Sequence, residues 1–177
     1  MENRKIRVGI THGDINGVGY EGILKTFSDP TMLELCTPVV YGSPKVAAYH
    51  RKAMEIQTSF SIVNSAEEVQ DGRVNVVNCI EEELKVELTK PTPEAGKAAL
   101  AALERALADY REGLFDVLVT APINKHTIQS DAFHFPGHTE YIEERVGEGQ
   151  KALMILLKND FRVALVTGHV PVSEISS

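Results

Sequence analysis

Segments that favour β-strands alternate with segments that favour helices along this chain of 177 residues. Apolar and β-branched residues dominate the expected strands, which we place at 6–11, 37–43, 60–64, 73–79 and 115–122. Helix-like segments stand between them, at 19–29, 44–56 and 92–113. This alternation predicts an α/β domain with a largely parallel sheet and flanking helices.

The segment 92–113 carries the strongest local helix signals. Thr92 is a suitable N-cap, Pro93 suits the first turn, and Gly113 suits the end. Further along, 137–147 is typical of a short helix, and 151–169 of two strands joined by a hairpin at Asn159-Asp160. The hairpin would add an antiparallel part, so we expect a mixed sheet.

Composition excludes several classes of partner. The net charge is −7 and the chain has no basic run, which disfavours nucleic-acid binding. No apolar run approaches the roughly 18 residues of a membrane span, and the N-terminus lacks the apolar core of a signal peptide. Cys36 and Cys79 stand alone without C-x-x-C spacing, so we expect two reduced, buried thiols in a cytoplasmic protein.

Three polar or glycine-rich stretches follow expected strands. They are "THGDINGVG" at 11–19, "TAPINKH" at 120–126 and "TGHVP" at 167–171. Ligands of open α/β sheets gather beyond the carboxyl ends of the strands. We therefore expect a ligand site at this edge.

The first stretch allows two interpretations. Its glycines permit a tight turn, and amides at the following helix start could hold a phosphate or carboxylate. It matches neither the dinucleotide nor the P-loop fingerprint, and a simple turn with Asp14 as a cap is an equal alternative. His12 and Asp14 could be ligands, or they could form a buried polar pair.

Lys125 and His138 are also candidate ligand-binding residues that have structural alternatives. Lys125 could neutralise an anionic substrate or transfer a proton, or it could be a solvated lysine at a helix start. His138 and Thr139 follow a Pro-Gly pair and could bind a phosphate or carboxylate. The alternatives are an N-cap role for Thr139 and a structural role for His138.

His169 follows an expected buried strand and a glycine. Neutral imidazole is the commonest side-chain metal ligand, but a metal site needs about three or four ligands. His169 itself belongs to no H-x-x-x-H or H-E-x-x-H pattern. By its pattern alone, a lone histidine is more often structural.

Four stretches together resemble the 4-hydroxythreonine-4-phosphate dehydrogenase family of vitamin B6 synthesis. They are "GITHGDINGVGYEGILK", "VLVTAPINKHTI", "FPGHTEYIEER" and "RVALVTGHVPVSEI", in this order. The resemblance implies a fold like that of isocitrate and isopropylmalate dehydrogenases. It also implies a homodimer with active sites at the subunit interface, NAD, and a divalent metal (zinc, magnesium or cobalt) held by three histidines.

Site residues follow from the same resemblance. It maps His169 onto a metal ligand, and His138 and Thr139 onto the pair that contacts the phosphorylated substrate. Lys125 and Asp14 would border the cleft as candidate catalytic residues. The implied reaction is the NAD-dependent oxidation of 4-phosphohydroxy-L-threonine, followed by decarboxylation.

The resemblance also implies that residues 1–177 are the N-terminal part of a longer dehydrogenase. Two further metal-binding histidines and much of the NAD site would lie in a remainder absent here, so we expect this chain alone to be inactive. The loop "GDINGVGYE" lacks the family's two prolines, which leaves a related four-carbon sugar-acid phosphate as an alternative substrate. A non-catalytic module that binds an anion or mediates dimerisation is the other alternative.

Overall fold

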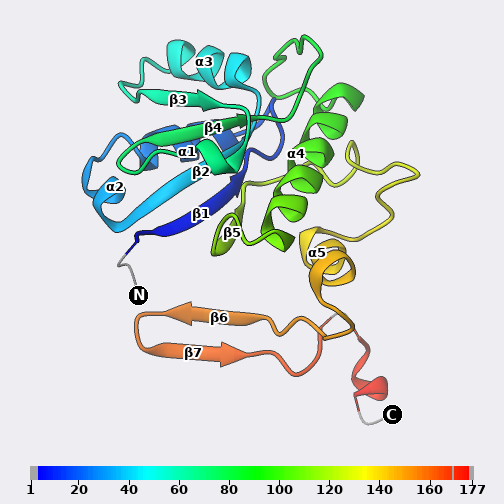
Figure 1. The fold of residues 1–177 in the computed structure, drawn as a ribbon. Helices are drawn as coiled ribbons and strands as arrows, with labels where there is room; N and C mark the ends of the chain where they lie inside the picture. The colour runs from blue at the N-terminus through cyan, green and yellow to red at the C-terminus, as the bar shows by residue number, and fades with distance from the viewer. Residues whose placement is uncertain (1–3, 169, 176–177) are drawn as a thin grey trace. The chain divides into compact units, whose positions relative to one another are not determined.

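The computed structural model describes residues 4–168 and 170–175, and the chain divides into two compact units, Met1–His138 and Thr139–Ser177. The first unit contains β1 (Ile6–Thr11), α1 (Gly19–Thr26), α2 (Thr31–Leu35), β2 (Cys36–Gly42), α3 (Pro44–Ala53), β3 (Phe60–Val63), β4 (Val74–Asn78), α4 (Pro93–Arg111) and β5 (Val117–Thr120) (Figure 1). The last residue of the first unit, His138, is also the first residue of helix α5 (His138–Val146). The second unit continues with β6 (Ile155–Lys158) and β7 (Phe161–Ala164). Short 3-10 helices cover Ala66–Glu68 and Val172–Glu174.

The first unit is built on a five-stranded sheet in the order β3-β4-β2-β1-β5. All four of its strand pairings are parallel, as the alternating sequence pattern predicts. The expected antiparallel part does not join this sheet. It forms a separate two-stranded sheet, β6-β7, in the second unit.

Helices cover both faces of the five-stranded sheet. Successive side chains of β2 point to opposite faces, so both faces of this strand are apolar. Val40 packs on one face with residues of α1 and α3, whereas Val39 and Tyr41 pack on the other face with residues of α4. Figure 1 shows α4 on its own side of the sheet. A central strand buried on both faces therefore has an unbroken apolar sequence, "PVVY".

Helix α4 confirms its sequence signals. The Thr92 side chain accepts a hydrogen bond from the backbone of Ala95 at 3.3 Å, and Pro93 occupies the first turn. Gly113 follows the helix with a φ of 72°, the left-handed conformation that glycine tolerates best. Local capping chemistry thus sets both ends of this helix.

Strand β5 is less buried than its apolar sequence predicts. It is the edge strand beside β1, and Val117 and Val119 are 44% and 47% exposed. Helix α2 is absent from the sequence-based assignment, since it has only five residues and its N-cap, Pro30, makes no side-chain cap.

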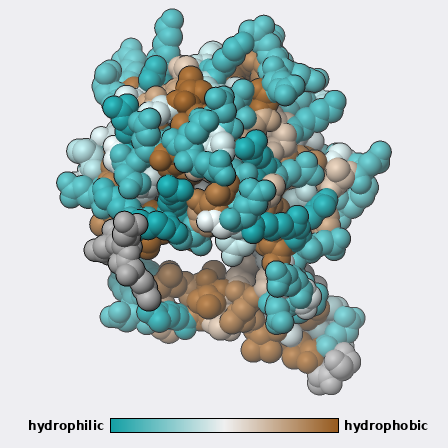
Figure 2. Space-filling model, viewed as in Figure 1, coloured by the Kyte–Doolittle hydropathy of each residue, from teal (hydrophilic) through white to brown (hydrophobic). Residues whose placement is uncertain are grey.

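The second unit contains the expected hairpin with Asn159 at a φ of 52° in its turn. The sequence predicts burial for the second of these strands, β7, which precedes His169, and this is wrong for the described residues. Leu157 and Phe161 are 67% and 73% exposed, and Figure 2 shows apolar side chains gathered over the β6-β7 region. The apolar sequence of the hairpin indicates a surface that needs a partner.

Cys36 and Cys79 are both free, but each is only partly buried, which corrects the expectation of buried thiols. Burial raises the pKa of Cys36 and that of Cys79, the latter to about 12. Both thiols therefore stay protonated and are poor nucleophiles near neutral pH. In the described part of the chain, no helix is long and apolar enough to cross a membrane.

Candidate functional site

The loops that follow β1 and β5 meet at the carboxyl edge of the sheet. The order β3-β4-β2-β1-β5 places β2 on one side of β1 and β5 on the other. The backbone N–H of Asp14 donates to the carbonyl of Pro122 at 2.9 Å, so the two loops are joined directly. This reversal of strand order is where open α/β sheets bind ligands.

Two glycines allow this close approach. Gly13 has a φ of 71°, and a Cβ there would lie 2.3 Å from the carbonyl oxygen of Pro122. At Gly19, the first residue of α1, a Cβ would lie 2.1 Å from the carbonyl oxygen of His12. The glycines of the first stretch therefore allow the loop after β1 to fold compactly and to pack against the loop after β5.

His12 and Asp14 have separate structural roles and do not form the buried pair considered above. The Asp14 carboxylate accepts a hydrogen bond from the backbone of Asn16 at 2.9 Å and thereby caps its own turn. His12 is fully buried and stacks on Tyr20, with ring centroids 5.3 Å apart. Its Nε2 donates to the carbonyl of Ala98 at 3.2 Å, whereas its Nδ1 is buried without a partner.

The burial of His12 predicts acid sensitivity. Burial, as the main cause, lowers the pKa of His12 from 6.5 to about 4, so the folded chain keeps this ring neutral. Between these two values the unfolded chain binds the proton and the folded chain does not, so stability falls as the pH falls. We expect the titration of His12 to lower the free energy of unfolding by on the order of 3 kcal/mol between pH 6.5 and 4.

Urea unfolding at several pH values measures this effect. The variant His12→Gln has no titrating ring, so the free energy of unfolding should fall less steeply with acid than in the parent chain. His134→Gln is the matched control, because its side chain is exposed. Equal pH dependence in the parent chain and His12→Gln would contradict the prediction.

Lys125 lies in a turn that directly follows β5 and its Ala-Pro pair. The Asn124 side chain accepts hydrogen bonds from the backbones of His126 and Thr127, at 3.0 and 3.2 Å, and so shapes this turn. The Lys125 side chain is exposed, as the solvated alternative requires. Contact of Lys125 with an anion stays a prediction.

His138 and Thr139 are the first two residues of α5, as the sequence predicts. His138 is half-buried, and burial followed by the charge of Lys125 lowers its pKa. The structure therefore brings Lys125 and His138 into one electrostatic environment within the first unit. Thr139 is exposed, and it lies inside the helix rather than at an N-cap.

His169, the predicted metal ligand, lies outside the described residues. Among the residues that the structure describes, no group of three histidine, cysteine, aspartate or glutamate side chains could hold a metal ion. The described residues therefore do not fit a complete metal centre. The role of His169 stays a prediction.

Sequence reasoning missed two residues that hold the loops together. Asn16 is buried, and its side chain bonds to the carbonyl of Lys90 at 2.9 Å and to the backbone N–H of Glu87 at 2.8 Å. The Gln129 side chain donates to the carbonyls of Lys125 and Phe135, at 3.2 and 2.9 Å. No sequence pattern marks either residue, because their partners are set by the tertiary fold.

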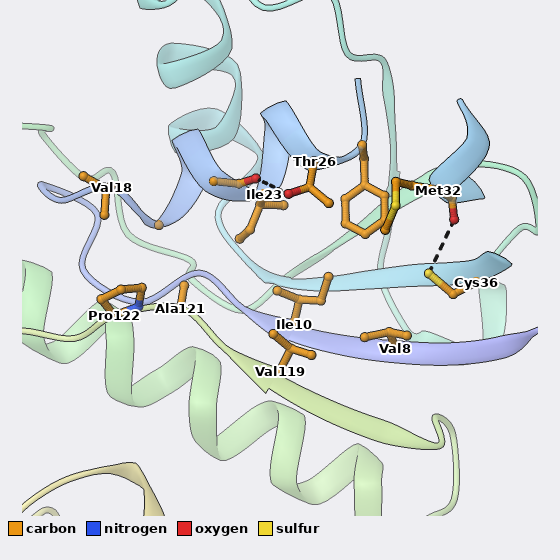
Figure 3. Close-up of a pocket in the computed structure, with 13 residues that line it drawn as sticks. Val8, Ile10, Val18, Ile23, Thr26, Met32, Cys36, Val119, Ala121 and Pro122 are labelled. Atoms are coloured by element: carbon orange, nitrogen blue, oxygen red, sulfur yellow. Dashed lines mark hydrogen bonds between the residues drawn. The ribbon is translucent and has the colours of Figure 1, made fainter. Parts of the chain in front are cut away.

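A separate groove of about 460 Å³ lies between α1 and the edge of the sheet (Figure 3). Its lining is apolar, with Ile10, Ile23 and Val119 among its labelled residues. The Thr26 hydroxyl in its wall is already bonded to the carbonyl of Gly22 at 2.7 Å. Without charged side chains in its lining, this groove suits apolar packing and not a phosphorylated substrate.

Comparison with known proteins agrees with the loop motifs. The family model "Pyridoxal phosphate biosynthetic protein PdxA" matches residues 34–177. A 4-hydroxythreonine-4-phosphate dehydrogenase of Bacteroides thetaiotaomicron is 74% identical over 100% of this chain and 49% of its own length. A D-threonate 4-phosphate dehydrogenase of Cupriavidus necator is 30% identical over 92% of this chain and 49% of its own.

Solved structures agree with the fold. The crystal structure of a 4-hydroxythreonine-4-phosphate dehydrogenase from Burkholderia phymatum matches with a TM-score of 0.82 and 27% identity, over 96% of this chain and 52% of the other. The chain thus spans about half the length of the curated relatives that it matches. Motifs, fold and family model lead to one assignment: the chain belongs to the family of the pyridoxal phosphate biosynthetic protein PdxA.

Proposed function

We propose that this chain, in a protein of its relatives' length, serves the NAD-dependent oxidation of 4-phosphohydroxy-L-threonine. The observation that carries the proposal is 74% identity, over the whole chain, to a protein named for this dehydrogenase activity. Oxidation of the secondary alcohol transfers a hydride to NAD and releases a proton. The product is a β-keto acid, which then loses carbon dioxide.

The chain's own contribution is to bind and orient the substrate. We assign His138 and Thr139, the first two residues of α5, to contact an anionic group of the substrate. We assign Lys125 to supply a positive charge to the substrate, which fits the contribution of its charge to the lowered pKa of His138. The backbone N–H of Asp14 bonds to the carbonyl of Pro122, and its carboxylate caps the turn at Asn16. We therefore assign Asp14 to hold together the two loops that follow β1 and β5.

NAD and a divalent metal (zinc, magnesium or cobalt) complete this proposal. When bound, NAD would supply the hydride acceptor, and the metal would supply stabilisation of negative charge on the substrate oxygen. We assign His169 as one metal ligand on the strength of the family resemblance, with the other ligands outside this chain. We also propose a homodimer, on the same resemblance, and a cytoplasmic location, on the two cysteines without disulfide-type spacing.

The test needs a protein of full family length. We define the completed enzyme as this chain continued by the remaining half of the Bacteroides relative. With NAD and a divalent metal, it should form NADH from 4-phosphohydroxy-L-threonine. The 177-residue chain under the same conditions should give no turnover, since His169 alone cannot form a metal site.

A substrate panel separates this proposal from its closest alternative. The relative from Cupriavidus necator is named for D-threonate 4-phosphate, and the loop "GDINGVGYE" departs from the family pattern. We expect a higher kcat/KM with 4-phosphohydroxy-L-threonine than with D-threonate 4-phosphate. The opposite order would reject the proposed substrate, and turnover by the 177-residue chain alone would reject the need for the remaining half.

A further inference from the structure

The turn after β1 contains the only Asn-Gly pair of the sequence, Asn16-Gly17. Asparagine is a thermolabile residue. It loses ammonia fastest when glycine follows, because the next backbone nitrogen then reaches the side-chain amide with the least steric hindrance. On an exposed loop such a pair would deamidate readily. Asn16 is instead only 3% exposed and lies where three parts of the first unit meet.

Asn16 holds these parts together with its side chain and its backbone. Its amide nitrogen donates to the carbonyl of Lys90 at 2.9 Å and to the hydroxyl of Thr92, the N-cap of α4, at 3.2 Å. Its amide oxygen accepts a hydrogen bond from the backbone N–H of Glu87 at 2.8 Å. Its backbone carbonyl accepts one from the backbone N–H of Thr89 at 2.9 Å. These bonds fasten the segment before α4 to the loop that follows β1.

We call residues 79–92, the irregular connection between β4 and α4, the strap. Within the strap, Thr89 has a φ of 67°, a left-handed conformation that β-branched residues rarely adopt. Strained backbone of this kind persists only where the surrounding contacts over-determine it. The bond from the Thr89 N–H to the Asn16 carbonyl is one of these contacts. Asn16 therefore helps to hold a strained strap in place.

Both groups that react in a deamidation already have hydrogen-bond partners in this structure. The reaction requires the backbone nitrogen of Gly17 to attack Cγ of Asn16. Here the Gly17 N–H donates to the carbonyl of Asp14 at 3.0 Å, and both polar atoms of the Asn16 amide are bonded to the strap. The reaction therefore needs a local opening that breaks these bonds.

We propose that Asn16-Gly17 is a deamidation site that the strap protects, and that deamidation releases the strap. After local opening, the Gly17 nitrogen bonds to Cγ of Asn16 and loses its proton, the Cγ–Nδ2 bond breaks, and ammonia leaves. Water then adds to one of the two carbonyls of the cyclic imide and breaks its bond to nitrogen, which leaves aspartate or isoaspartate. The reaction consumes only water and is independent of the proposed dehydrogenase activity.

Neither product can restore the original hydrogen bonds. An ionised aspartate has no N–H to donate to the carbonyl of Lys90, and its negative charge would be buried against that carbonyl oxygen. Isoaspartate lengthens the backbone in a tightly packed loop, where a Cβ at Gly19 would already lie 2.1 Å from the carbonyl oxygen of His12. Each product therefore favours an open strap, and the loss of ammonia makes the change irreversible.

Deamidation of the 177-residue chain in a mildly alkaline buffer tests the protection. Peptide mapping by mass spectrometry follows Asn16 in the folded chain and in the chain unfolded by urea. The folded chain should react about tenfold more slowly or less, because opening breaks several hydrogen bonds. Equal rates in the two states would overturn the protection.

Gly17→Ala is the chemical control for the reactive pair. The fold tolerates this change, since a Cβ at Gly17 would lie no nearer than 3.5 Å to the listed neighbours of the Asp14 turn. Its methyl group hinders the attack on Cγ, so Asn16 should react more slowly than in the parent when both chains are unfolded in urea. Equal rates of the two unfolded chains would reject Asn16-Gly17 as the labile pair.

Thr92→Val weakens the protection without changing the reactive pair. It removes the hydroxyl that accepts a hydrogen bond from Asn16, so the folded chain should deamidate about fivefold faster, with an unchanged rate in urea. Thr92→Ser keeps the hydroxyl and should react like the parent. Because Thr92→Val also removes the N-cap of α4, the matched control is Ser43→Ala, which removes the N-cap of α3. Equal acceleration in Ser43→Ala would overturn the local protection by the strap.

Asn16→Asp tests the release of the strap. Trypsin should cleave after Lys85, an exposed residue of the strap, about tenfold faster than in the parent. Asn64→Asp, the same change at an exposed asparagine, should leave this rate unchanged. Cleavage after Lys52, an exposed lysine of α3, should also stay unchanged in Asn16→Asp. A parent-like rate after Lys85, or equal acceleration after Lys85 and Lys52, would overturn a local release.

Discussion

His169→Ala in the completed enzyme is expected to lower the affinity for the divalent metal about 100-fold or more, and to remove most of the NADH formation. Loss of an outer-shell partner of a metal ligand already costs 10- to 100-fold in affinity or activity, so loss of a ligand itself should cost at least as much. Equilibrium dialysis against zinc, magnesium and cobalt measures the affinity directly. NADH formation at saturating metal then shows whether added metal restores activity.

The matched control for this variant is His134→Ala. His134 is an exposed histidine of the same chain, so its removal should leave metal affinity and turnover close to those of the parent. Unchanged metal affinity in His169→Ala would reject its assignment as a ligand. A loss of turnover with unchanged metal affinity would instead place His169 in substrate binding.

Sequence signals that act locally predicted the structure well. Helix α4 starts and ends where Thr92, Pro93 and Gly113 indicate, because caps and helix-compatible φ angles depend only on neighbouring residues. The parallel sheet followed from the alternation of strands and helices. His138 at the start of α5 followed from the Pro-Gly pair before it.

Burial was harder to predict, since it depends on what packs against an element. The apolar runs of β5 and β7 predicted buried strands, yet Val119 and Phe161 are 47% and 73% exposed. Apolar sequence shows that a segment favours burial, but it does not identify the partner that buries it. Relatives of twice the length carry additional residues that could supply such partners.

The tertiary contacts of the candidate site were also beyond local reasoning. The sequence identified Lys125 and His138 as separate candidates, whereas their electrostatic coupling is visible only in the structure. Gln129 bonds to carbonyls four residues before it and six residues after it. Backbone carbonyls carry no sequence signature, so a residue that binds two of them is found only from coordinates.

Gly96→Ala is expected to destabilise the chain by about 3 kcal/mol or more, through overpacking. Gly96 lies in the first turns of α4, where helix propensity alone would make alanine better by about 1 kcal/mol. A Cβ at this position would lie 1.8 Å from the carbonyl oxygen of Thr127 and 2.3 Å from its carbonyl carbon. Because these are backbone atoms, the clash is relieved only if the 121–138 segment moves away from the helix.

Gly22→Ala in α1 separates packing from propensity. A Cβ at Gly22 meets no atom within 4 Å, so this variant should be more stable than the parent by roughly 0.5 to 1 kcal/mol. Urea unfolding of both variants measures whether each is less or more stable than the parent chain. If Gly96→Ala were as stable as Gly22→Ala, the contact between α4 and Thr127 could not be what fixes the segment.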